Sequence, residues 1–154
     1  TEVNEFQREE TGQWEKNERE VYTGQWMLCE LNREFPTWLT IWPRERMDKL
    51  FGSKTIRTGN ETFDKRFNVS SDDEAAALHI LTPDCEEKIL ALADSSFGKF
   101  AINLNSDGRL YLAVHSGHGF FDLGKGREDP AQLRRRFTRE LTWFTNMIDV
   151  FRGA

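Results

Sequence analysis

Two of the three histidines, His115 and His118, lie three residues apart and follow an apolar run that is typical of a strand. Binding loops often follow strands, and two imidazoles at this spacing could share a metal ion. A metal site needs further ligands, and the chain has neither a His-Glu-x-x-His nor a Cys-x-x-Cys pattern. The pattern therefore favours a structural or solvent-exposed role for both histidines. A metal-assisted hydrolase that uses them with an unidentified carboxylate is the alternative.

The other candidates for acid–base chemistry fall in a predicted helix. His79 lies inside it with no nucleophile beside it, which favours a hydrogen-bonded neutral histidine over a catalytic base. Asp72, Asp73 and Glu74 resemble an acidic cluster, but they occupy the first turn, where negative charge stabilises the helix dipole. We therefore expect no catalytic residue, no cofactor-binding residue and no cofactor.

A basic cluster precedes and opens the last predicted helix; it comprises Lys125, Arg127, Arg134, Arg135, Arg136 and Arg139. A solvated helix face is the usual meaning of such a cluster. The functional alternative is contact with phosphate or an anionic membrane, which we assign to Lys125, Arg127, Arg134, Arg135 and Arg139. The neighbouring Gly124-Lys125-Gly126 lacks the hydroxyl residue of a phosphate-binding loop and indicates a connector.

The balance of charge disfavours nucleic acid as a partner. The chain has a net charge of -5, and its first 20 residues hold seven glutamates against three basic residues. A nucleic-acid binder usually shows the opposite balance. The tryptophans Trp26, Trp38 and Trp42 also lack the interleaved Lys and Arg of a base-stacking surface, so we expect them in the core.

Cysteine usage and hydropathy bear on the compartment. Cys29 and Cys85 are far apart in sequence, which favours two reduced thiols and a cytosolic location. The chain has no apolar run long enough to span a membrane and no export signal, and it begins without methionine, as a domain cut from a longer protein would. We expect an acidic, loosely ordered lead-in over 1–20, with a strand starting near Trp14, and one domain over 21–154.

The first part of that domain is predicted to form a hairpin. Residues 19–31 are rich in β-branched and aromatic types, residues 32–36 suit a turn, and residues 38–42 suit the partner strand, which Pro43 closes. A short helix is expected over 43–52 and a short strand over 54–57. A helical turn over 63–67 should lead into a strand at 67–69.

Capping and turn residues predict the central elements. Ser71 with Glu74 forms a capping box, which predicts a helix over 72–81. Thr82 followed by Pro83 and Asp84 predicts a second helix directly after it. Asp107-Gly108 between the alternating segments 100–104 and 110–114 predicts a second hairpin, because type I′ turns require positive φ.

Asp129, Pro130 and Gln132 predict the start of a long helix that ends near Arg152. An apolar stripe follows along it at steps of three and four: Leu133, Phe137, Leu141, Phe144, Ile148 and Phe151. The predicted fold is therefore α+β. It has a mainly antiparallel sheet built from two hairpins, two short central helices and a long C-terminal helix packed on the sheet.

The order of motifs over Phe63 to Ile102 adds a resemblance. Its pieces are Phe-Asp-Lys-Arg-Phe-Asn-Val-Ser-Ser-Asp-Asp, Ala-Ala-Ala-Leu-His-Ile-Leu-Thr-Pro, Ile-Leu-Ala-Leu and Phe-Gly-Lys-Phe-Ala-Ile, and Leu110 to Val114 supplies a later Leu-Tyr-Leu-Ala strand. This stretch resembles the bacterial domain-of-unknown-function family 3137, over Val21 to Phe151. The resemblance implies a fold and no established activity. Members of that family often carry hydrophobic helices ahead of the soluble domain, and this sequence lacks them.

Strong fold signals without a catalytic constellation favour a non-enzymatic binding or regulatory module. The resemblance implies a place at the cytoplasmic face of a bacterial membrane, as the cytoplasmic domain of a membrane-anchored protein, with a membrane surface or a protein as its partner. Two alternatives stay open. They are the metal-assisted hydrolase that uses His115 and His118, and an anionic-lipid-binding domain that uses the basic cluster.

Overall fold

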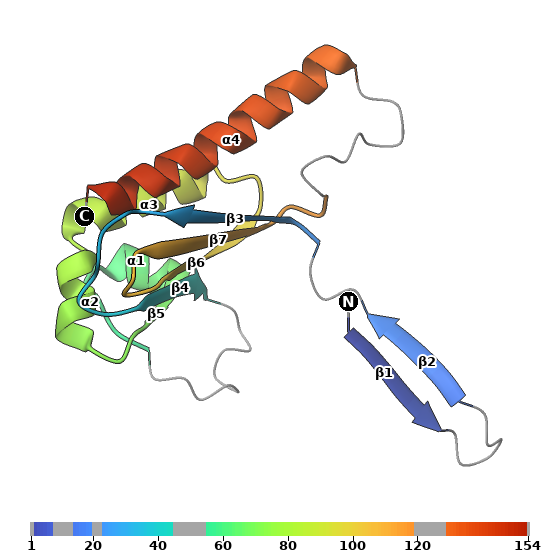
Figure 1. Ribbon diagram of the computed structural model, residues 1–154, viewed down its shortest axis with the longest axis horizontal. Coiled ribbons are helices and arrows are strands. Elements are labelled where there is room, and N and C mark those ends of the chain that lie inside the picture. The colour runs from blue at the N-terminus through green and yellow to red at the C-terminus, as the bar shows by residue number, and fades with distance from the viewer. Residues whose placement is uncertain (1, 8–13, 20–22, 45–54, 119–128, 154) are drawn as a thin grey trace.

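The computed structural model describes residues 2–7, 14–19, 23–44, 55–118 and 129–153 (Figure 1). Its centre is a five-stranded antiparallel sheet in the order β3-β7-β6-β4-β5, with the strands β3 (Gln25–Glu30), β4 (Leu39–Pro43), β5 (Phe67–Ser70), β6 (Lys99–Leu104) and β7 (Arg109–His115). The helices are α1 (Glu61–Arg66), α2 (Glu74–Ile80), α3 (Pro83–Asp94) and α4 (Pro130–Arg152). The predicted α+β class is confirmed.

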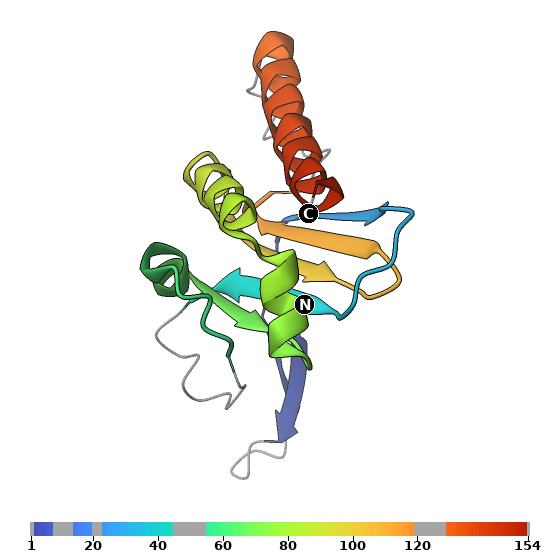
Figure 2. The ribbon, with the colours of Figure 1, turned by 90° about the vertical axis from the view of Figure 1, so that its left-hand side faces the viewer.

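The sheet is covered by helices on one face. Alternate residues of β4, β6 and β7 are buried, and the inward rings meet α3 and α4. The Phe100 ring on β6 lies 5.1 Å from the Trp143 ring on α4, and Trp143 Nε1 donates to the Leu92 carbonyl of α3 over 2.8 Å. Figure 2 shows the two helices side by side over the sheet. The other face of the strands carries no described helix.

The predicted hairpin between the first two strands of the domain is wrong. β3 pairs with β7, and β4 pairs with β6 and β5. The intervening loop is held by the β6–β7 turn, because Leu31 N donates to Gly108 O over 2.9 Å and Phe35 N donates to Ser106 O over 2.8 Å. Because of these bonds, the chain crosses the β6–β7 turn after β3. β4 therefore lies beside β6 and does not reverse to pair with β3.

Helix starts agree with the sequence in part. Thr82 caps α3 through a 3.3 Å bond from Cys85 N, as predicted. The capping box at Ser71 is wrong, because Asp73 is the N-cap of α2 and accepts the Ala76 N–H over 3.0 Å. Ser71 Oγ instead accepts from Asp73 N. At α4, Asp129 holds the N-cap position without a side-chain hydrogen bond.

Of the remaining predicted elements, some are confirmed and one falls mostly outside the described residues. β6 and β7 form the predicted hairpin, with Gly108 at φ 83°. α1 precedes β5 as expected, and Ile56 makes an isolated bridge to Val69. Pro43 ends β4, and the helix expected over 43–52 falls mostly in 45–54, outside the described residues. An antiparallel ribbon of β1 (Glu2–Gln7) and β2 (Trp14–Arg19) precedes the domain, so β2 begins at Trp14 as expected, while β1 was not expected.

The buried face of α4 differs from the predicted stripe. Leu141 is 45% exposed, and the buried side chains are Glu140, Trp143, Phe144, Met147, Val150 and Phe151. No residue from 130 to 139 is buried. Figures 1 and 2 show the reason: the N-terminal half of α4 extends past β3, beyond the edge of the sheet.

Both cysteines are free thiols, as predicted. Burial raises the pKa of the Cys85 thiol to about 12. Among the described residues, no helix is both long and apolar enough to cross a membrane.

Candidate functional site

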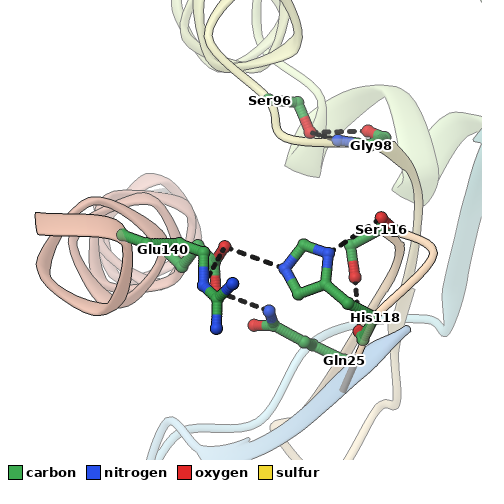
Figure 3. Close-up of polar contacts among 7 residues, drawn as sticks. Gln25, Ser96, Gly98, Ser116, His118 and Glu140 are labelled. Atoms are coloured by element: carbon green, nitrogen blue, oxygen red, sulfur yellow. Dashed lines mark hydrogen bonds and ion pairs between the residues drawn. The ribbon is translucent and has the colours of Figure 1, made fainter. Parts of the chain in front are cut away.

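A buried carboxylate lies in the middle of α4. The Glu140 side chain is fully buried, and Gln25 at the start of β3 donates its Nε2–H to Glu140 Oε2 over 2.6 Å (Figure 3). A charged group in such a position is costly unless hydrogen-bond donors and opposite charge surround it. The other partners of Glu140 therefore determine how far the cost of burying its carboxylate is offset.

His118 supplies the second contact. Its Nε2 lies 3.1 Å from Glu140 Oε1, and its Nδ1 lies 3.0 Å from the carbonyl oxygen of Ser116. A carbonyl oxygen only accepts, so Nδ1 carries a hydrogen. A proton must then also lie between Nε2 and the carboxylate, because two acceptors would otherwise face each other. The Ser116 hydroxyl donates to the His118 carbonyl over 2.7 Å and fixes the loop.

Arg136 completes the cluster from one turn earlier on α4. Its Nε lies 4.0 Å from Glu140 Oε1, and only 15% of its side chain is exposed. The guanidinium also lies over the Phe137 ring at 5.5 Å. We call Gln25, His118, Arg136 and Glu140 the Glu140 cluster. It joins β3, the segment after β7 and α4, so it sets where α4 crosses the sheet.

The second candidate site is the face of the sheet opposite the helices, which we call the open face. Trp26 is 64% exposed and Leu28 is 48% exposed on β3. The Trp26 ring lies 5.8 Å from the ring of Tyr111 on β7. Large apolar side chains that gather on a surface mark interaction sites more often than isolated ones do.

Strand register places the neighbours of these residues in two rows across the open face. One row runs Trp26, Ala113, Ala101, with two small side chains beside the tryptophan. The next row runs Leu28, Tyr111, Asn103, Thr40, and Asn103 Nδ2 donates to Thr40 Oγ1 over 2.8 Å. The exposed large apolar side chains of the open face therefore lie on β3, and the Leu28 row becomes polar toward β4.

The expectation that the tryptophans lie in the core is wrong for Trp26. It points outward because residues of β3 alternate and Gln25, Met27 and Cys29 take the inner face. Trp38 and Trp42 are half-buried. Aromatic type indicates a strand correctly here, but it does not indicate which face of the strand is covered.

The structure separates the two histidines of the predicted pair. His115 ends β7 on the open face, opposite Lys99 of β6, and is exposed. His118 turns inward to Glu140. Within the described ranges, no group of three His, Cys, Asp or Glu side chains is arranged to hold a metal ion. His79 is exposed near the end of α2.

The acidic cluster before α2 has structural contacts. Thr37 Oγ1 donates to Asp72 Oδ1 over 2.5 Å and lies 2.8 Å from Ser71 Oγ. The Thr37 hydrogen bond lowers the pKa of the Asp72 carboxyl. Asp73 caps α2 and Glu74 lies in its first turn. These contacts tie the loop before β4 to the start of α2.

The predicted basic cluster is divided. Arg134, Arg135 and Arg139 are exposed on the part of α4 that extends past the sheet. Arg136 belongs to the Glu140 cluster. Lys125 and Arg127 lie outside the described residues.

Sequence reasoning missed Gln25 and Glu140. The spacing of Glu140 was the available signal, because it lies three and four residues from Phe137 and Phe144 on the apolar stripe. An acidic residue in such a position requires buried donors. Nothing in the sequence indicates that Gln25, 115 residues away, is one of them.

Comparison with known proteins identifies a family. A family model described as "Protein of unknown function (DUF3137)" matches residues 20–152, which is nearly the whole chain. No curated protein and no solved structure matches the chain.

Proposed function

The chain belongs to the DUF3137 family of proteins of unknown function, and we propose that it is a non-enzymatic binding module at the cytoplasmic face of a bacterial membrane. Its binding surface is the open face. The observation that carries the proposal is the exposure of Trp26 and Leu28, at 64% and 48%, beside Tyr111. Tryptophan and tyrosine are the residues that anchor protein interfaces most often.

The inner side of the sheet supports this assignment. The core cluster contains buried apolar residues of β4, β5, β6 and β7, and Met27 and Cys29 of β3 pack against it, so Trp26 and Leu28 are not part of the core. We assign the Glu140 cluster a structural role, because it holds α4 against the inner face of the sheet. The open face thereby stays a rigid surface on hydrogen-bonded strands, and a preorganised surface loses less entropy on binding.

The proposal predicts that binding and stability respond separately to the double variant Trp26→Thr/Leu28→Thr. Threonine retains β-propensity, so we expect the free energy of unfolding to fall by less than about 2 kcal/mol. Proteins that co-purify with the tagged full-length protein from its own host should be lost from the double variant. Urea denaturation and quantitative mass spectrometry measure the two quantities.

The matched control is Thr142→Ala, which changes an exposed position on α4. It should retain every co-purifying protein that the unaltered chain retains. An unchanged set of co-purifying proteins in the double variant would remove the open face as the binding surface.

A second candidate function, binding to anionic lipid, is favoured by the charge of α4. Residues 130–139 contain four arginines and no acidic residue, and three of the arginines are exposed. Basic side chains at an anionic membrane surface contribute about 1 kcal/mol each.

We expect binding to vesicles that contain acidic lipid, weakening as salt rises. The variant Arg134→Gln/Arg135→Gln/Arg139→Gln should bind about a hundredfold more weakly. Lys65→Gln, which removes an exposed charge on α1, should have no such effect. Co-sedimentation that does not depend on acidic lipid would exclude this second function.

A further inference from the structure

We draw no further inference here: the strongest candidate, a cleft of about 250 Å³ lined by Phe67 and Phe100 at one end of the sheet, has Arg66 at its wall already paired with Asp94 over 2.6 Å, and nothing in the structure shows what covers it.

Discussion

His118→Leu is expected to lower the free energy of unfolding by about 3 kcal/mol, because it removes a partner from a carboxylate that cannot reach water. Glu140 is fully buried, whereas the His118 side chain is 25% exposed. After the substitution the carboxylate keeps Gln25 as a close donor and Arg136 at 4.0 Å. For a domain of this size the melting temperature should fall by roughly 6–12 °C.

His115→Leu is the matched control, because His115 is exposed at the end of β7 on the open face, whereas His118 turns inward to Glu140. It should change stability by no more than about 0.5 kcal/mol. The double variant His118→Leu/Glu140→Leu should be more stable than His118→Leu alone, since replacing both partners removes the unpaired charge. Urea denaturation measures all three. A double variant that is less stable than His118→Leu alone would contradict this pairing.

Gly108→Ala is expected to cost at least about 4 kcal/mol or to prevent folding, which places it among the most severe single substitutions. A Cβ at this position would lie 2.0 Å from the backbone carbonyl oxygen of Arg33, and the residue has φ 83°. Both the β6–β7 turn and the loop that crosses it would have to move. That crossing carries β4 away from β3, so the substitution acts on the topology of the sheet.

Gly117→Ala separates the cost of the steric clash from the cost of the positive φ. Gly117 has φ 74° and would place a Cβ in open space, so only the conformational cost remains. That cost is about 1–2 kcal/mol for an L-residue in the left-handed region. Thermal unfolding of the two variants compares them directly. Equal losses of thermal stability in Gly108→Ala and Gly117→Ala would mean that the loop from Leu31 to Phe35 is not packed on the β6–β7 turn.

The sequence predicted those parts of the fold that depend on neighbouring residues. The β6–β7 hairpin follows from Asp107-Gly108, and α3 follows from Thr82 and Pro83, because turn and cap chemistry act within a few positions. The pairing of β3 was predicted wrongly because its partner β7 is about 80 residues away in the sequence. The turn-like composition between β3 and β4 was real, but it does not determine which strand follows in the sheet.

The candidate sites were harder to predict for the same reason. The Glu140 cluster depends on Gln25 and His118, which no local pattern connects to α4. The open face was missed because Trp26 and Leu28 have the composition of core residues, and alternation alone does not say which face the helices cover. The apolar stripe was assigned to packing on the sheet along the whole of α4, whereas the sheet covers only the later part of the helix.

The proposed function depends most on contact between Trp26, the exposed aromatic residue of β3, and a partner. Photo-crosslinking in the host cell tests it most directly, with a photoreactive phenylalanine analogue at position 26 of the full-length protein and the same analogue at Thr142 as the control. We predict a covalent adduct of defined mass from position 26 that is absent from position 142. The absence of an adduct at position 26, or the same adducts from both positions, would contradict the claim.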